Sequence, residues 1–205
     1  MTEELPLFPL QTVLFPGGLL SLKVFEARYL DLASTCLREK RPFGVVALRK
    51  GQEVRRSGQD EPGAVVFEDV GVMAEILELD GAQPGILQLR CRGLRRFRIE
   101  RTHQRADGLW VGEVETLPDD EPIAPAEAVH ETVRGLANAI ASLKGKGVEP
   151  FEAPYRFDDA GWVANRWCEI LPIPLAAKQR LMELPDARVR LALVDEFLRG
   201  QGVVK

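Results

Sequence analysis

LPLFPLQTVLFPGG, the stretch from Leu5 to Gly18, is almost wholly apolar and contains three prolines and a closing pair of glycines. Proline cannot donate a backbone hydrogen bond to a β-ladder, so strands that contain it are confined to sheet edges, strand starts or bulges. We therefore predict short strands at LPLFPL and VLF. FPGG is predicted to be a turn, because proline presets φ and glycine accepts a positive φ.

The same stretch lacks the features of an export signal. A signal peptide starts with a positive charge and continues as an uninterrupted apolar run, whereas the first basic residue here is Lys23 and prolines at 6, 9 and 16 cut the run. No later segment has the roughly 18 uninterrupted apolar residues of a transmembrane helix. Three widely spaced cysteines leave one unpaired under any disulfide scheme, which favours a reducing compartment. We expect a soluble, cytoplasmic protein with no membrane partner.

The chain after Gly18 keeps a mostly two-residue period as far as about Glu115. Leu20, Leu22 and Val24 alternate with polar residues and predict a half-buried strand. Residues 26–40 change to helical spacing, and Pro42 ends this predicted helix. FGVVALR is a predicted strand, followed by a polar loop over 50–63. Further strands are predicted at AVVFE, VGVMAEILEL, GILQLRC, RRFRIE and LWVGEVE.

Asp80-Gly81 is the strongest hairpin signal in this half of the chain, because this dipeptide favours the tight turns that join antiparallel strands. Many short strands in succession predict an antiparallel sheet that curls sharply or closes into a pseudo-barrel. The helix at 26–40 is then an insertion into the β-rich part.

The second half has a helical period. Residues 117–125, LPDDEPIAP, are rich in proline and acid and predict a linker. Apolar residues at helical spacing from Val129 to Leu143 predict one helix, which the glycines at 145 and 147 end. Asp158 or Asp159 is predicted to cap the next helix. In the last helix, Val189, Leu193 and Phe197 form the predicted buried line. The fold class is thus α+β, with a β-rich subdomain at 1–116, a linker at 117–125 and an α-helical bundle at 126–205.

The sequence nominates no catalytic, cofactor or metal site. Only two histidines are present, His103 and His130, far from each other and from any cysteine pair, which excludes a local metal motif. No serine lies in a nucleophile motif, and the phosphate-binding loop sequence is absent. We expect a non-enzymatic protein without cofactor or metal. A small hydrolase whose site is assembled from distant residues stays open as an alternative.

The net charge of -4 argues against general binding to nucleic acid, but one stretch is basic. Residues 90–105 contain seven arginines and one acid. Attachment to phosphates through this stripe is a second alternative. A strand with Arg96, Arg98 and Glu100 on a solvated outer face, opposite Phe97 and Ile99, explains the same pattern, so we do not expect nucleic acid as a partner.

Several motifs occur in a specific order. They are PLFPL (6–10), FPG (15–17), FExRY (25–29), PFG (42–44), VGxxAxI (70–76) and GxxRFxI (93–99), with KQxLxE (178–183) in the helical half. In this order they resemble the amino-terminal, substrate-binding domain of the Lon protease family. The resemblance covers nearly the whole chain and implies a curled β subdomain joined to a helical bundle. Because the sequence stops at Lys205, we expect no ATPase or serine-lysine protease module.

The resemblance implies a non-catalytic module that binds unfolded or peptide-like segments of other proteins, with a separate protease or a chaperone as a further partner. The β subdomain can hold an extended chain through backbone hydrogen bonds and shallow pockets. Candidate contacts are Phe8, Phe15, Phe25, Arg28, Tyr29, Arg96 and Phe97. The competing interpretation is structural: Glu26 and Arg28 form an ion pair with Arg96 that fixes the helix on the sheet, and Tyr29 and Phe97 are core residues.

Overall fold

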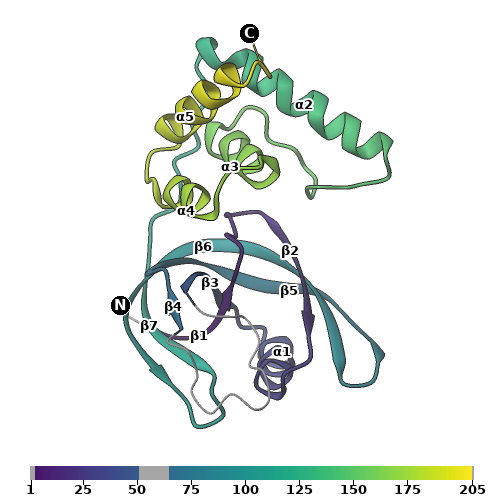
Figure 1. Ribbon diagram of the computed structural model, residues 1–205, viewed down its shortest axis with the longest axis vertical. Coiled ribbons are helices and arrows are strands. Elements are labelled where there is room, and N and C mark those ends of the chain that lie inside the picture. Colours follow the sequence, from purple (N-terminus) through teal and green to yellow (C-terminus); the bar gives the residue numbers. More distant parts are fainter. Residues whose placement is uncertain (1–2, 51–64, 205) are drawn as a thin grey trace. The chain divides into compact units, whose positions relative to one another are not determined.

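A computed structural model describes residues 3–50 and 65–204 (Figure 1). It divides into two compact units, residues 1–118 and 119–205, each described here by itself. Apart from Lys50, the predicted polar loop at 50–63 lies outside the described residues. Within the described parts of the chain, no helix is long and apolar enough to cross a membrane.

The first unit is a sheet with one helix. Its elements are β1 (Glu3–Leu10), β2 (Leu19–Val24), α1 (Ala27–Glu39), β3 (Phe43–Lys50), β4 (Val66–Phe67), β5 (Val70–Gln83), β6 (Ile86–Gln104) and β7 (Trp110–Thr116). GILQLRC and RRFRIE, which we predicted as two strands, are parts of the single long strand β6. Of the predicted strand AVVFE (64–68), only β4 forms, and Ala64 lies outside the described residues. The strands β1, β2, β3, β5 and β7 lie at their predicted positions.

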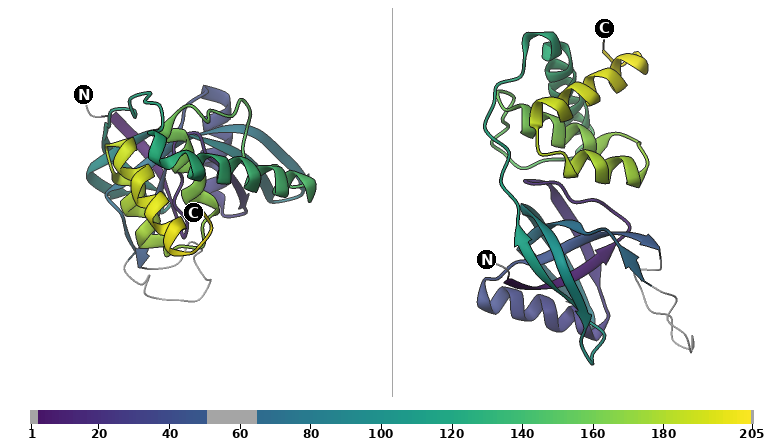
Figure 2. Two further views of the ribbon diagram at one scale, coloured as in Figure 1. Left: turned by 90° about the horizontal axis from the view of Figure 1, so that it is seen from above. Right: turned by 90° about the vertical axis from the view of Figure 1, so that its left-hand side faces the viewer.

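The sheet curls back on itself. β1 pairs antiparallel with β7 and parallel with β3, and the path β1-β7-β6-β5-β3 therefore returns to β1. β2 pairs with β6 outside this circuit, and β4 pairs with β3. The curved strands are visible in both views of Figure 2. The predicted α+β class with a curled, mainly antiparallel sheet is confirmed.

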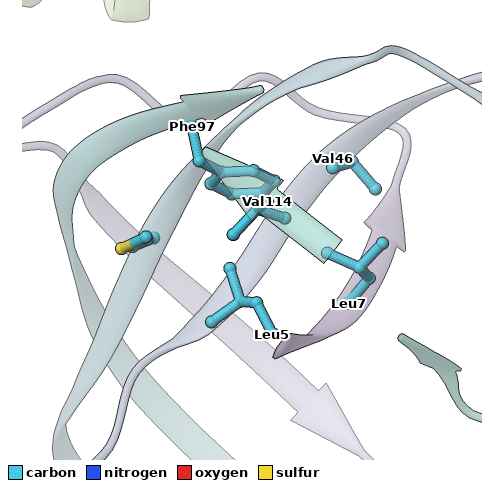
Figure 3. Close-up of a cluster of buried hydrophobic side chains, with 6 residues drawn as sticks. Leu5, Leu7, Val46, Phe97 and Val114 are labelled. Carbon is cyan, nitrogen blue, oxygen red and sulfur yellow. The ribbon is translucent and has the colours of Figure 1, made fainter. Parts of the chain in front are cut away.

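The inside of the curled sheet is filled by the Phe97 ring and its aliphatic neighbours. Phe97 is fully buried and packs with Leu5, Leu7, Val46 and Val114, whose side chains point toward one another in Figure 3. The ring also explains two glycines. A Cβ atom on Gly44 or on Gly71 would lie 2.7 Å from Cζ of Phe97, and the one on Gly71 would also collide with a backbone carbonyl of β3. Both glycines therefore make room for one ring.

FPGG forms the predicted turn. Gly18 N–H donates to the Phe15 carbonyl at 2.9 Å, and Gly17 has a φ of +71°, as in a type II turn. The turn is tied to β6 by reciprocal bonds with Gly93, 2.8 Å each, from Gly17 N–H to Gly93 O and from Gly93 N–H to Gly18 O. VLF, residues 13–15, is buried but is not a strand, so that prediction was wrong. Its backbone leads into the turn instead of pairing in a ladder.

The β5–β6 hairpin turns later than predicted. Gln83 pairs with Ile86, which leaves Pro84 and Gly85 as the two-residue loop, and Gly85 has a φ of +75°. Asp80 and Gly81 are part of β5, next to an irregularity in the pairing register. The prediction of a turn at Asp80-Gly81 was wrong because a Pro-Gly loop four residues later supplies the required φ values.

The second unit consists of helices. They are the 3-10 turn η1 (Glu127–Val129), α2 (His130–Gly145), α3 (Ala160–Ile170), α4 (Leu175–Glu183) and α5 (Ala187–Gly200). α3 contacts α2, α4 and α5 and is buried over most of its length. Asp159 caps α3 by accepting from Gly161 N–H at 2.9 Å and Trp162 N–H at 3.2 Å, as one of the two predicted caps.

The buried side of α5 differs from the predicted one. The exposed fractions of Val189, Leu193 and Phe197 are 46%, 44% and 37%, whereas Arg190 and Leu191 are buried together with the residues at 187, 194 and 198. The prediction of a buried line at Val189, Leu193 and Phe197 was wrong. On the buried face, the Arg190 guanidinium donates to Asp120 Oδ2 at 2.6 Å and to Asn165 Oδ1 at 3.1 Å.

Candidate functional site

A groove of about 440 Å³ opens in the first unit between the end of β1, strand β2 and the start of α1. β2 supplies one wall with residues 20–24, and Phe8 and Leu10 of β1 form the other side together with Thr12. Phe25, Glu26 and Tyr29 line the end at which β2 passes into α1. The lining is mainly apolar, with a few polar groups, as is usual for sites that bind organic or peptide ligands.

Two stacked rings lie at the base of this groove. The Phe8 and Tyr29 rings are nearly parallel, at 5°, with centroids 3.9 Å apart, and Phe43 packs on Phe8 at 6.2 Å. The guanidinium of Arg28 lies 4.6 Å from the centroid of the Tyr29 ring. Phe8 and Tyr29 are buried, so they give the groove a rigid floor.

Phe25 differs from these rings because it is not packed into the core. It directly follows β2, and 48% of its surface is exposed. Exposed aromatic side chains next to an apolar groove are typical of binding surfaces, where they supply contact area at a low cost in side-chain entropy.

The strand β2 has a pairing partner on one side. Among the described residues it pairs with β6 alone, from Leu19 opposite Arg92 to Val24 opposite Leu87. Its side chains alternate between half-buried leucines and the exposed Ser21 and Lys23. An edge strand of this kind offers backbone N–H and C=O groups to an added strand.

The structure brings together three of the seven predicted contact residues. Phe8, Phe25 and Tyr29 line the groove. Phe15 and Phe97 have no exposed surface, and Arg96 is 5% exposed. Residues fully covered by the core cannot contact a client in this structure, so Phe15 and Phe97 are core residues here. Leu10, Thr12 and Lys23 also line the groove and were not singled out from the sequence.

The predicted ion pair forms in part. Arg28 Nη2 lies 2.9 Å from Glu26 Oε2, and Arg28 Nη1 donates to the Gly108 carbonyl at 2.8 Å. Arg28 therefore ties the start of α1 to the loop before β7, and its guanidinium also packs on the Tyr29 ring. Arg96 does not face this pair as predicted: its Nη2 donates to the Pro118 carbonyl at 3.1 Å, at the other end of the unit's chain.

A second hollow, of about 480 Å³, lies on another side of α1 and is lined by charged residues together with Cys36 and His103. Burial raises the pKa of the Cys36 thiol to about 11, and burial raises the pKa values of Cys91 and Cys168 to about 12. These thiols are protonated at neutral pH and are poor nucleophiles. In the described part of the chain, no cluster of three or more His, Cys, Asp or Glu residues is arranged to hold a metal ion.

Two residues of the arginine stripe, Arg90 and Arg92, are paired with acids on the neighbouring strand β5. Arg90 Nη1 lies 3.0 Å from Glu78 Oε1, and Arg92 Nη2 lies 2.6 Å from Glu75 Oε1 across the β5–β6 pair. Arg96 is buried rather than on a solvated face, which corrects the predicted alternation. The paired Arg90 and Arg92 and the buried Arg96 interrupt the continuous positive surface that phosphate backbones require.

Comparison with known proteins decides the family. Residues 4–200 match the family described as the ATP-dependent protease La (LON) substrate-binding domain. The chain belongs to the LON substrate-binding domain family. A crystal structure of a Lon N-terminal domain protein from Xanthomonas campestris has a TM-score of 0.73 and 32% identity, covering 94% of this chain and 96% of that one.

Other relatives of this LON domain are longer proteins. Lon protease 2 of Myxococcus xanthus is 29% identical over 200 residues, which are 96% of this chain and 23% of that protein. The chain thus spans about a quarter of the length of the curated relatives it matches. The N-terminal domain of a Mycobacterium avium complex Lon protease shares the fold, with a TM-score of 0.64, 20% identity and coverage of 96% of this chain and 98% of that one.

Proposed function

We propose that this LON domain is a non-catalytic module that binds extended, apolar segments of unfolded proteins along the outer edge of β2. The observation that carries the proposal is the position of this edge: β2 borders the aromatic groove, and within the described residues it pairs with β6 alone. An added strand can satisfy backbone groups on β2 while its alternate side chains enter the groove.

The groove residues divide this task between them. Phe25, exposed at the end of β2, supplies an apolar contact for the client's side chains. Phe8 and Tyr29 form the floor and hold their positions because they stack on each other. Lys23 and Glu26 add one charge of each sign to the lining. These residues favour a ligand that is extended and apolar but not strongly charged.

We further propose that captured segments pass to a separate protease. The family match and the Lon protease names of the relatives support this, whereas the three buried, free cysteines support a reducing, cytoplasmic setting. The raised pKa values of the same cysteines argue against a cysteine nucleophile. The residues that line the groove do not indicate which protease receives the captured segments.

A titration tests the binding proposal. The probe is a fluorescein-labelled peptide of about eight residues, the length of a common strand, with alternating apolar and polar side chains. We expect saturable binding by fluorescence anisotropy and a dissociation constant about tenfold higher for Phe25→Ala. Leu37→Ala is the matched control, because Leu37 is also an exposed apolar residue, 40% accessible, but lies outside the groove.

Backbone pairing is tested with the same peptide methylated at alternate amide nitrogens. If the peptide adds to β2 as a strand, methylation in one of the two registers removes the hydrogen bonds and abolishes binding, while the other register binds normally. Equal binding of both methylated forms would contradict strand addition. Equal binding by Phe25→Ala and wild type would contradict the assignment of the groove.

A further inference from the structure

The last helix carries a partly exposed apolar line within the helical unit. Val189, Leu193 and Phe197 recur every four residues along α5 and are 46%, 44% and 37% exposed. Three large apolar side chains at this spacing form one continuous strip on a helix. Isolated exposed apolar residues are ordinary, but a continuous strip indicates a contact surface.

A second line runs beside this strip and bears charges at its two ends. Arg188, Ala192 and Glu196 follow the same four-residue spacing, each one position before a member of the strip, and all three are exposed. Within the described residues, neither the Arg188 nor the Glu196 side chain has an ion-pair partner. The next ion pair on the helix is separate and joins Arg199 to Asp195 at 2.7 Å.

This charge pattern is complementary to itself when the helix is reversed. If two copies of α5 pack antiparallel about a two-fold axis at Ala192, Arg188 of one copy meets Glu196 of the other, twice. Ala192 at the crossing point is small and permits a close approach of the two helix axes, which is typically about 8–10 Å. A parallel arrangement would instead place like charges at the same level, which is unfavourable.

We propose that α5 is a self-association surface on which a second copy of this chain packs antiparallel, with Ala192 at the crossing and the strip of Val189, Leu193 and Phe197 packed beside it. The contact is one helix wide and is therefore at the weak, transient end of protein interfaces. It lies in the helical unit, whereas the peptide groove lies in the first unit. Two weak grooves joined in one dimer would bind two segments of the same unfolded chain more tightly than one.

Charge exchange tests this proposal. Sedimentation of the full chain over a concentration series is expected to show a shift from 22.8 kDa toward twice this mass. Arg188→Glu should raise the dimer dissociation constant about tenfold or more, because it places like charges together twice. Glu196→Arg should do the same. The double exchange, Arg188→Glu with Glu196→Arg, should restore association to within about threefold of the wild type.

Arg180→Glu is the matched control, because Arg180 is an exposed arginine on α4 and its reversal changes the net charge by the same amount. It should leave association unchanged. Because these residues are exposed, thermal unfolding should be nearly the same for all variants. A wild-type chain that stays monomeric at every concentration would overturn the proposal. A double exchange that associates no better than the single variants would overturn the antiparallel geometry.

Discussion

At the scale of single residues, the Phe97 ring determines which positions in the neighbouring strands must be glycine. It is fully buried inside the curled sheet and lies against Gly44 of β3 and Gly71 of β5. These glycines belong to PFG and VGxxAxI, and Phe97 belongs to GxxRFxI. Three motifs that are far apart in the sequence thus meet at one ring, which gives their co-occurrence a physical reason.

Gly71→Ala should lower the free energy of unfolding by about 1–3 kcal/mol, because the new methyl group would collide with the Val45 carbonyl oxygen and the Phe97 ring. Gly81 in the same strand provides the control. A Cβ there lies in ordinary contact, 3.4 Å from Leu87 Cδ2, so Gly81→Ala should change stability little. Urea unfolding of both variants measures the difference, and equal effects would contradict the packing argument.

The cysteines allow a test of the hydrolase alternative at the same scale. Since burial raises the pKa of Cys36 to about 11, only about one Cys36 thiol in a thousand is deprotonated at pH 8. We expect slow reaction of all three native thiols with a chromogenic disulfide, a rise in the Cys36 rate with increasing pH, and rapid reaction after unfolding. A native thiol that reacts rapidly at neutral pH would revive a cysteine-based enzyme.

At the scale of elements, the sequence predicts whether a segment is a strand or a helix better than it predicts where the segment ends or which side is buried. Strands with two-residue alternation, such as β2 and β3, and the helix before Pro42 lie where they are expected. The hairpin turn was misplaced because Asp80-Gly81 and Pro84-Gly85 are both turn-forming pairs, and only long-range pairing selects between them. Local signals cannot tell which turn gives the register that buries the core.

Periodicity alone also could not identify which face of α5 is buried. Two lines on this helix have a helical repeat, Val189, Leu193 and Phe197 on one side and Leu191, Val194 and Leu198 on the other. The second line is buried because it lies on the side of α5 that packs against α3, where Arg190 also bonds to Asp120 and Asn165. A buried arginine is a poor guide in a sequence, since arginine is usually exposed.

Helix capping provides a test at this scale. Asp159→Ala should cost about 1 kcal/mol of unfolding free energy, because the backbone N–H groups of Gly161 and Trp162 lose their acceptor. Asp158→Ala is the neighbouring control, as Asp158 is exposed and does not cap α3. Thermal unfolding followed by circular dichroism compares the two. A larger effect at Asp158 would contradict the assigned cap.

At the scale of the whole molecule, the α+β class could be inferred from the periodicity and the family from the order of the motifs, but the candidate site could be inferred only in part. Phe8, Phe25 and Tyr29 were singled out because of their motif positions, and the structure places them around one groove. Phe15 and Phe97 look the same in the sequence yet are fully buried. Burial depends on how the sheet curls, which the residues near each phenylalanine do not specify.

Amide hydrogen exchange tests most directly whether an extended segment adds to the edge of β2. Amide exchange of the full chain is measured by mass spectrometry with and without a saturating amount of the alternating peptide. If the peptide adds to β2, it should slow amide exchange within residues 19–25. This protection should be smaller in Phe25→Ala and unchanged in Leu37→Ala. Peptide-dependent protection confined to other parts of the chain, with no change across residues 19–25, would contradict it.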